Sequence, residues 1–315
     1  MKKVLVTGGA GFIGSHIVKT LVEKKYFVRV LDNFSSGSRR NLQDFVTDVE
    51  VIEGDIRSQE DCLTATDGID FVLHQAALRS VPKSMKYPHE YDQVNIGGTL
   101  NMLEASLKNK VKSFVFASSS SVYGDIDTFP EKEGFVPEPI SPYALTKLTG
   151  EYYCKIFTLH YGLPTVSLRY FNVFGPRQSL DDEYAVVIPK FITSMLEDKR
   201  PPIFGTGKQS RDFTFVSNVV QANMLAAQKA GLPRVKGNVF NVAGGRDYTI
   251  LELVEILNKI MRKDIAADFL SKRAGDVFRT RADLSRAKKV LGFHPEIDFC
   301  KGLKITVDYF KGKRQ

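Results

Sequence analysis

Short runs of apolar, mainly β-branched residues alternate with longer amphipathic stretches along most of the chain. In the amphipathic stretches the apolar residues recur every three or four positions, as at Ile13, Ile17 and Leu21, which is the spacing of one helix face. This alternation predicts a parallel sheet with helices on both faces. The expected buried strands are Val4–Val6, Val28–Leu31, Val51–Ile52, Phe71–Leu73, Phe114–Phe116 and Val166–Leu168.

The pattern changes after Tyr170, where loops rich in Pro and Gly precede a further strand at Val239–Val242 and a helix from about Leu251. No repeat or flexible linker separates the two halves of the sequence. We therefore expect an α/β protein with a doubly wound parallel sheet and a smaller C-terminal α/β domain. The expected domains are 1–172, completed by 212–243, and 173–315, interleaved with the first.

Length and composition narrow the class of protein. The 315 residues suffice for about two domains, and 43% hydrophobic with 25% charged residues is ordinary for a globular chain. Three cysteines far apart in sequence, Cys62, Cys154 and Cys300, favour a reducing compartment and no zinc ribbon. The five histidines form no cluster with metal-ligand spacing, so we expect no metal.

The first residues resemble the start of a signal peptide, but their apolar run stops at Thr7. We read this run as a first β-strand and expect a cytoplasmic protein. The sequence contains no apolar stretch of 18 residues, so we expect no membrane span.

Positive charge is concentrated near the C-terminus. The net charge is +8, and residues 261–315 carry 14 Lys and Arg against 7 Asp and Glu. Scattered basic residues without a nucleic-acid-binding motif favour solvated helix faces, or a few arginines that bind a phosphorylated small ligand. We expect neither a nucleic acid nor a membrane as partner.

A glycine motif follows the first expected strand. Gly9, Gly11 and Gly14 fit GxGxxG, and a helix pattern begins directly after it. Glycines allow the tight turn and let backbone N–H groups approach a pyrophosphate at the helix N-terminus, although a merely structural turn can also collect glycines. Asp32 ends the second strand, where a carboxylate can bind the adenosine ribose and repel a 2′-phosphate. The motif therefore predicts a Rossmann-type domain that binds NAD rather than NADP.

A second motif places a tyrosine and a lysine on one helix face. Ser141 is a plausible N-cap and Pro142 suits the first turn, so Tyr143 and Lys147 lie at i and i+4. An ammonium near a phenol lowers the phenol's pKa and makes it a usable base. Such a pair is common on protein surfaces. Here, however, a run of four serines, 118–121, ends a strand at the edge of the sheet where open α/β sheets bind ligands. The serines and the glycine motif together favour a catalytic pair over a surface pair.

These motifs together resemble the extended short-chain dehydrogenase/reductases, specifically the UDP-glucose 4-epimerase family. The resemblance covers Lys2 to about Phe299 and includes TGGAGFIGS, GDIR, HQAA, SSSSVYG, YALTK, LRYFNVFGPRQ, GTGKQSRDF and RAGD. It implies that Tyr143 is the catalytic base, that Lys147 lowers its pKa and binds the nicotinamide ribose, and that Ser119 is the catalytic serine. Ser118 and Ser120 remain alternatives for that serine.

The resemblance also implies the binding residues. The cofactor is expected against Gly8, Gly11, Phe12, Ile13, Gly14, Asp32, Asn33, Asp55, Ile56, Gln75, Ala76, Ala77, Asn95, Tyr143, Lys147 and Tyr170. The UDP-sugar is expected against Ser119, Ser120, Tyr143, Asn172, Val187, Gln209, Arg211, Arg273, Asp276 and Thr280. Arginines suit the diphosphate because they form bidentate, charge-assisted hydrogen bonds.

The reaction is inferred from what the serine run lacks. Relatives that dehydrate or decarboxylate usually carry an acid just after the catalytic hydroxyl, whereas this chain has Ser120 and Ser121. We therefore expect 4-epimerisation of a UDP-hexose through a 4-keto intermediate, with UDP-GlcNAc/UDP-GalNAc, UDP-Glc/UDP-Gal or both as substrates. Alternatives are a UDP-glucuronate 4-epimerase, another nucleotide-sugar dehydratase, and a non-catalytic NAD-binding protein.

Thr280 bears on the choice of sugar. In the family, a tyrosine at the matching position accompanies UDP-glucose alone, and a smaller residue admits an N-acetyl group. We therefore expect UDP-GlcNAc to be accepted. Arg79 stands where that branch often has glycine, and it could narrow the pocket. Relatives are usually dimers, so we expect a homodimer formed by helices near Leu100–Leu107 and Leu148–Phe157.

Overall fold

A seven-stranded parallel sheet organises the first part of the chain. The computed structural model describes residues 1–179, 187–271 and 277–312. The strand order is β11-β6-β5-β4-β1-β2-β3, and every neighbouring pair is parallel. The strands are β1 (Lys3–Thr7), β2 (Phe27–Asp32), β3 (Val49–Glu53), β4 (Phe71–His74), β5 (Ser113–Ser119), β6 (Thr165–Tyr170) and β11 (Asn238–Val242). All seven strands predicted from the apolar runs are confirmed.

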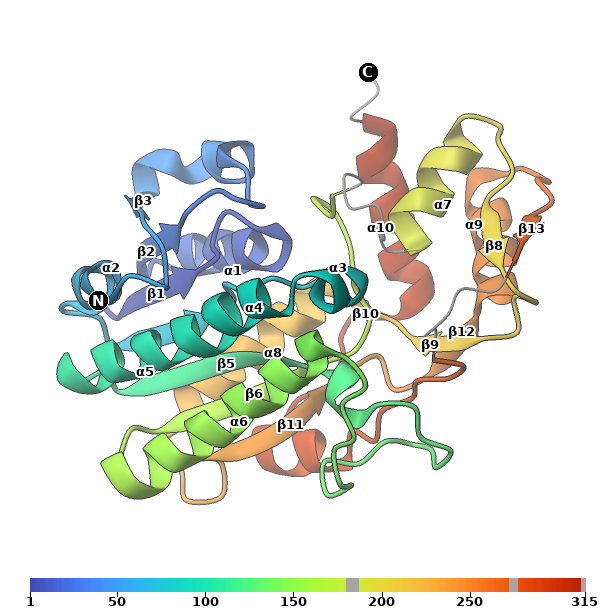
Figure 1. Ribbon diagram of the computed structural model, residues 1–315. Coiled ribbons are helices and arrows are strands. Elements are labelled where there is room, and N and C mark those ends of the chain that lie inside the picture. Colours follow the sequence, from blue (N-terminus) through green and yellow to red (C-terminus); the bar gives the residue numbers. More distant parts are fainter. Residues whose placement is uncertain (180–186, 272–276, 313–315) are drawn as a thin grey trace.

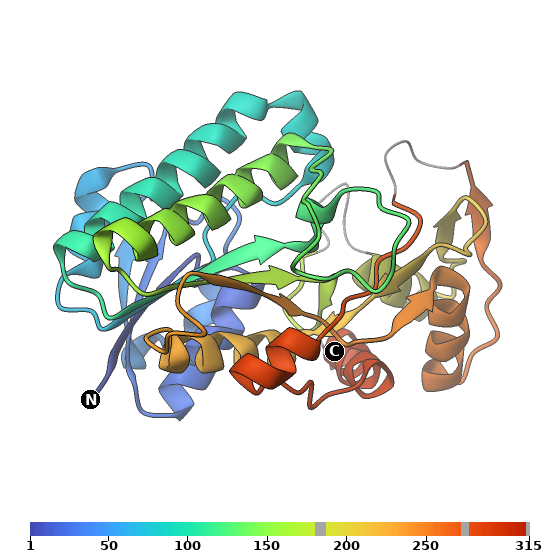
Figure 2. The same cartoon turned by 90° about the horizontal axis from the view of Figure 1, so that it is seen from below.

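Helices cover both faces of this sheet, as Figure 2 shows. Alternate residues of β1 belong to opposite faces of the sheet: Val4 and Val6 pack with α1 and α8, whereas Leu5 packs with α2, α5 and α6. The apolar runs are continuous because both sides of each central strand are buried. The helices are α1 (Phe12–Glu23), α2 (Gln59–Thr66), α5 (Gly98–Lys108), α6 (Pro142–Tyr161) and α8 (Val216–Lys229).

Short helical segments complete this part of the chain. They are η1 (Arg39–Asp48), α3 (Val81–Lys86), α4 (Pro88–Tyr91), η2 (Asp92–Gly97) and η3 (Ser120–Tyr123).

The second part of the chain packs around its own apolar core, to the right in Figure 1. Thr249 and Glu252 form a reciprocal capping box at the start of α9, one residue before the helix start predicted near Leu251. The helices around this core are α7 (Val187–Leu196), α9 (Ile250–Met261) and α10 (Phe299–Gly312), whereas η4 (Ala287–Leu291) packs against α8 and β11 in the first core. The strand pairs are β7 (Val173–Phe174) with β10 (Thr214–Phe215), β9 (Ser210–Asp212) with β12 (Asp247–Thr249), and β8 (Pro202–Phe204) with β13 (Asp268–Leu270).

The two parts of the chain are interleaved. Strand β11 pairs with β6, and α8 packs against β4, β5 and β6, although both follow the first strands of the second part. On this basis we propose that 212–243 complete the domain 1–172, and that 173–315 otherwise form the second domain.

The order of the strands determines where a ligand can bind. From β1 the chain adds β2 and β3 on one side, and β4, β5 and β6 on the other. The reversal opens a crevice at the carboxyl ends of the strands, which is where open α/β sheets bind ligands. None of the helices in the described ranges is both long and apolar enough to cross a membrane.

Candidate active site

The turn from β1 to α1 is built so that the backbone of Gly8 approaches Gly14 closely. Gly8 has φ +65°, and a Cβ added to Gly14 would lie 2.1 Å from the Gly8 carbonyl oxygen. Gly11 is the N-cap of α1 and supplies no side-chain cap, and no acidic residue lies in the first turn. The helix N-terminus therefore presents backbone N–H groups and positive dipole charge to an anion.

Acidic residues follow at the ends of β2 and β3. Asp32 accepts hydrogen bonds from the backbone N–H of Ala10 at 2.9 Å and of Phe34 at 2.8 Å, which fixes its carboxylate beside the glycine turn. Burial raises the pKa of Asp32, and these two hydrogen bonds oppose that rise. Asn33 donates to Asp55 at 2.9 Å. The hydrogen bonds from Arg57 hold the pKa of Asp55 well below its usual range, so Asp55 is ionised.

A cavity of about 760 Å³ runs from the glycine turn to Tyr143 and has the size of a cofactor site. Of the residues predicted to bind the cofactor, all but one line it: Gly8, Gly11, Phe12, Ile13, Gly14, Asp32, Asn33, Asp55, Ile56, Gln75, Ala76, Ala77, Tyr143, Lys147 and Tyr170. The glycine turn suits a pyrophosphate and Asp32 suits ribose hydroxyls, so these residues fit NAD.

Asn95, the remaining predicted cofactor residue, lies behind the cavity wall. It is buried, accepts from the Leu78 N–H at 2.8 Å and donates to Thr146 at 3.0 Å. Leu78 itself lines the cavity, so Asn95 supports the wall.

The α6 helix holds Tyr143 and Lys147 on one face. Ser141 caps the helix by accepting from the Ala144 N–H, and Pro142 occupies the first turn, so both predictions are confirmed. Lys147 is buried and donates to the Ala117 carbonyl oxygen at 2.8 Å. Burial lowers the pKa of Lys147 to about 7.

Opposing effects act on the pKa of Tyr143. Burial raises its pKa, while the hydrogen bond with Ser119 and the charge of Arg79 lower it. The Lys147 ammonium donates to the Ala117 carbonyl oxygen, and its effect on the pKa of Tyr143 stays a prediction.

The serine run divides into two kinds of hydroxyl. Ser118 lines the cavity but donates its hydroxyl hydrogen to the buried carboxylate of Glu151. Ser119 ends β5, lies close enough to Tyr143 to lower the pKa of that phenol, and accepts from the Ser121 N–H at 3.2 Å as the cap of η3. Ser120 begins η3 and is half-buried. Ser119 is thus the serine that the fold places at Tyr143.

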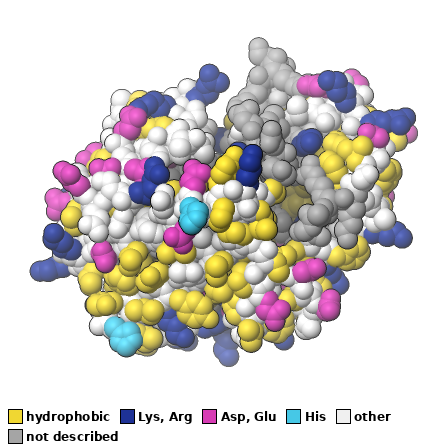
Figure 3. Space-filling model, in the orientation of Figure 1, with side chains coloured by type: hydrophobic (Ala, Val, Ile, Leu, Met, Phe, Trp, Pro, Cys, Tyr) yellow, Lys and Arg dark blue, Asp and Glu magenta, His cyan; other side chains and the backbone are white. Residues whose placement is uncertain are grey.

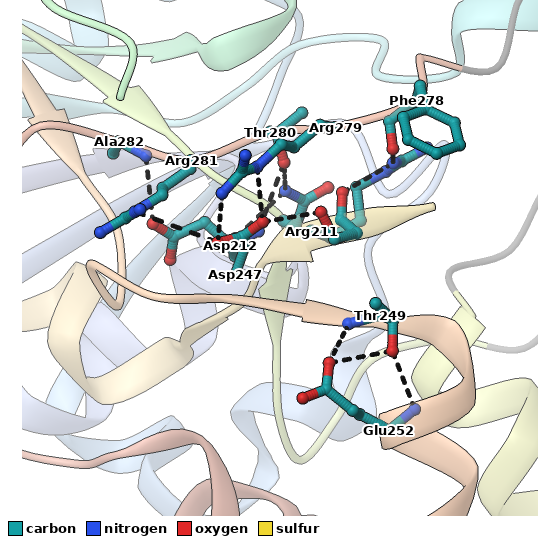
Figure 4. Close-up of polar contacts among 12 residues, drawn as sticks. Arg211, Asp212, Asp247, Thr249, Glu252, Phe278, Arg279, Thr280, Arg281 and Ala282 are labelled. Carbon is teal, nitrogen blue, oxygen red and sulfur yellow. Dashed lines mark hydrogen bonds and ion pairs between the residues drawn. The ribbon is translucent and has the colours of Figure 1, made fainter. Parts of the chain in front are cut away.

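The residues predicted for the UDP-sugar lie partly together beyond the sheet. Asn172 donates to the Thr280 hydroxyl at 3.0 Å and to the Asp212 carbonyl at 3.1 Å. Figure 4 shows Thr280 in the segment that lies beside β9, the strand of Arg211, whose guanidinium donates to the Ser210 and Phe278 carbonyls. Asn172, Arg211 and Thr280 therefore form one cluster.

Other predicted substrate residues are more dispersed. Gln209 donates to the Phe204 carbonyl at 2.7 Å, and Val187 begins α7 against the second core. Arg273 and Asp276 lie outside the described residues, so the structure does not place them.

His74 satisfies its hydrogen bonds within the core. Its ring nitrogens bond Thr7 at 2.8 Å and Thr99 at 3.1 Å, and burial lowers its pKa to about 3. No group of His, Cys, Asp or Glu within the described ranges is arranged to hold a metal ion.

Several cavity residues were not predicted from the sequence. The loop 35–38 directly follows Asp32 and Asn33, so its small polar residues could have been inferred from that neighbourhood. Thr193 of α7 and Phe310 of α10 gave no such signal, because only tertiary packing brings them to the cavity.

Comparison with known proteins agrees with this arrangement. The sequence model of the "NAD dependent epimerase/dehydratase family" matches residues 4–243. A UDP-N-acetylglucosamine 4-epimerase from Methanobrevibacter ruminantium, solved with UDP-N-acetylmuramic acid, is 41% identical, with TM-score 0.94 over 99% of both chains. A UDP-glucose 4-epimerase from Thermotoga maritima, solved with UDP-glucose, is 38% identical, with TM-score 0.92 over 99% of this chain and 100% of that one.

A third structure, a UDP-glucuronic acid 4-epimerase from Bacillus cereus with UDP-glucuronic acid and NAD, is 35% identical, with TM-score 0.90 over 99% of both chains. These matches extend over nearly the whole of each protein and share one type of reaction on one class of sugar nucleotide. The chain therefore belongs to the NAD dependent epimerase/dehydratase family and is an NAD-dependent enzyme of the UDP-sugar 4-epimerase type.

Proposed function

We propose that this protein interconverts UDP-hexoses by inverting carbon 4 of the sugar through a 4-keto intermediate. The observation that carries the proposal is that Tyr143 and Lys147 line the NAD-sized cavity and that Ser119 lies beside Tyr143. The residues that follow Ser119 are Ser120 and Ser121, so no acid stands where relatives that dehydrate usually carry one.

Each residue then has a distinct task. Tyr143 takes the proton of the sugar's 4-hydroxyl and later returns it to the oxygen of the rotated 4-keto group, so the proton balance closes within one turnover. Ser119 donates a hydrogen bond to the oxygen that reacts. NAD, when bound, would supply a reversible acceptor for the C4 hydride. Lys147 contributes positive charge beside the cofactor, and its near-neutral pKa makes that charge sensitive to pH.

We propose that UDP-N-acetylglucosamine is among the substrates. Thr280 is much smaller than tyrosine, and its hydroxyl is held by Asn172, which keeps the side chain against the Asp212 strand. The relative from M. ruminantium is a UDP-N-acetylglucosamine 4-epimerase, in agreement with this proposal. Arg211, with Arg273 and Asp276, is proposed to bind the UDP.

A second candidate is the 4-epimerisation of UDP-glucuronate. Arg79 lines the cavity beside Tyr143, and a guanidinium there could pair with a sugar carboxylate. The relative from B. cereus acts on UDP-glucuronic acid.

One assay separates these candidates. Purified protein is incubated with UDP-glucose, UDP-N-acetylglucosamine or UDP-glucuronate, and the epimers are separated by chromatography while bound NAD is quantified. The proposal expects conversion of UDP-N-acetylglucosamine. Conversion of UDP-glucuronate alone would favour the second candidate, and bound NAD without conversion of any sugar would favour a non-catalytic protein.

We also propose a homodimer formed through α5 and α6. One face of α6 carries Leu145, Tyr152, Ile156 and Leu159, which are 42–66% exposed and lie at helical spacing. Figure 3 shows hydrophobic side chains gathered over this side of the molecule, and an apolar stripe of this kind is typical of an interface. Light scattering should give a dimer for the wild type and a monomer for the double variant Ile156→Glu and Leu159→Glu. A monomeric wild type would refute the proposal.

A further inference from the structure

A buried ion pair lies directly behind the candidate active site. Glu151 is on α6, one turn after Lys147 and two turns after Tyr143. Its Oε1 accepts from Arg169 Nε at 2.8 Å and its Oε2 from Arg169 Nη2 at 2.7 Å, so the pair is bidentate. Glu151 is 5% exposed and Arg169 is 3% exposed. Such a pair is well shielded from solvent and holds two elements in a fixed geometry.

The same carboxylate also accepts the hydroxyl hydrogen of Ser118. Glu151 therefore joins three elements: α6 through its own backbone, β5 through Ser118, and β6 through Arg169. Ser118 and Arg169 are register partners in the sheet, and the next pair in that register is Ser119 with Tyr170. The ion pair is thus one residue away from the serine at Tyr143 and from a tyrosine that lines the cavity.

The hydrogen bond direction at Ser118 is determined by chemistry. An ionised carboxylate only accepts hydrogen bonds, so Ser118 must donate its single hydroxyl hydrogen to Glu151. That hydrogen is unavailable to a ligand in the cavity. Ser119 contacts both Tyr143 and the Ser121 hydroxyl, and its hydroxyl can rotate between them.

Arg169 extends the network to the segment that follows Ser119. Its guanidinium lies 4.6 Å from the ring centre of Tyr123, at the end of η3. The Tyr123 hydroxyl donates to Asn241 of β11 at 2.7 Å, and both residues are fully buried. The ends of β5 and η3 on either side of Ser119 are therefore both anchored to this ion pair.

We infer that Glu151 and Arg169 are positioning residues that set the distance between Ser119 and Tyr143 through Ser118. The inference rests on the proposed function. The helix that carries Tyr143 and the strand that carries Ser119 are joined at two neighbouring points: Lys147 with the Ala117 carbonyl, and Glu151 with the Ser118 hydroxyl. Loss of the hydrogen bond between Ser118 and Glu151 would let α6 shift along β5. A misplacement of about 1 Å can reduce a rate by about 100-fold.

The experiment uses two serines of one buried strand. Ser118→Ala removes the hydroxyl that bonds Glu151. Ser113→Ala is the matched control, because Ser113 is equally buried at the far end of β5 and makes one side-chain hydrogen bond, to the Ala227 carbonyl. Glu151→Gln is a second, stronger perturbation. For each NAD-loaded variant, kcat, KM and the pH dependence of kcat are measured with the UDP-hexose that the wild type converts.

We expect Ser118→Ala to lower kcat about tenfold with KM changed less than threefold, and Ser113→Ala to stay within twofold of wild type. The acid limb of the kcat profile should move to higher pH in Ser118→Ala, because a looser Ser119 no longer lowers the pKa of Tyr143 to the same extent. Glu151→Gln, where it folds, should show the same shift with a larger loss of kcat.

Equal effects of Ser118→Ala and Ser113→Ala would overturn the inference, since they would report only a loosened strand. A rise in KM with unchanged kcat would also overturn it. A second readout does not depend on turnover: the tyrosinate absorbance of each variant, after subtraction of the matching Tyr143→Phe protein, gives the pKa of Tyr143. A rise in Ser118→Ala alone supports the inference even if no tested sugar is converted, and an unchanged pKa refutes it.

Discussion

Replacing Gly14 by alanine is a direct test of the glycine turn. The new Cβ would lie 2.1 Å from the Gly8 carbonyl oxygen and 2.8 Å from the Gly9 Cα, and both atoms belong to the backbone. Side-chain Cβ atoms are essentially never found below 3.0 Å from such atoms. The turn and the first turn of α1 must therefore separate by about 1 Å.

The size of the effect follows from what that separation breaks. The Gly8 carbonyl accepts from the Gly11 N–H at 3.1 Å, so the movement lengthens this bond and turns the N-terminal N–H groups of α1 away from a bound pyrophosphate. A hydrogen bond to a charged group contributes about 1.5–3 kcal/mol. Loss of one such bond lowers the affinity for NAD by about 10- to 150-fold. Calorimetric titration of nucleotide-free protein with NAD measures this change.

Two other glycines provide the comparison. A Cβ on Gly11 would lie 3.1 Å from the Gly8 oxygen, and one on Gly97 would meet nothing within 4 Å. We expect a graded loss of affinity: large for Gly14→Ala, small for Gly11→Ala and none for Gly97→Ala. Wild-type affinity for NAD in a folded Gly14→Ala protein would refute the close-approach argument.

Three further predictions concern other parts of the site. Tyr143→Phe should lower kcat by about 100- to 10,000-fold while the protein retains NAD, because only the proton-transferring hydroxyl is removed; retained turnover would exclude Tyr143 as the base. Thr280→Tyr should reduce turnover of UDP-N-acetylglucosamine much more than that of UDP-glucose, whereas Thr280→Val, which loses the hydrogen bonds from Asn172 and from the Asp212 N–H, should affect both sugars equally. Burial and the nearby Asp212 raise the pKa of Glu131 to about 8, so the folded state holds this proton between about pH 4.5 and pH 8 and loses stability as the pH rises through that range. Glu131→Gln should remove this loss. The unfolding temperature of the variant should therefore rise relative to that of the wild type at pH 8 but not at pH 5.5.

The fold was largely predictable because the buried strands of a parallel sheet have a clear hydrophobic pattern in the sequence. Val4–Val6 and Phe114–Phe116 are buried on both faces, so their apolar runs are continuous and bounded by turn residues. The helix at Tyr143 was equally clear, since Ser141 and Pro142 mark its start by local chemistry. Signals of this kind act over a few residues and need no tertiary information.

The parts of the site that were missed depend on distant packing. The partners of Glu151 lie 33 and 18 residues away in sequence, and the helix spacing alone does not distinguish a buried acid from a surface one. The contact of Lys147 depends on packing in the same way: the spacing places Lys147 on the helix face of Tyr143, but β5 provides the acceptor of its ammonium. Phe310 reaches the cavity only because α10 packs beside α7.

The late return of β11 to the sheet has a consequence for biosynthesis. Strand β6 is buried along its whole length, and its outer edge is paired only when β11, about 70 residues further on, has left the ribosome. Until then the nascent chain presents an unpaired apolar edge of the kind that recruits other strands. A polypeptide that ends near residue 172 should therefore aggregate or engage chaperones, whereas one that extends past Val242 can close the sheet.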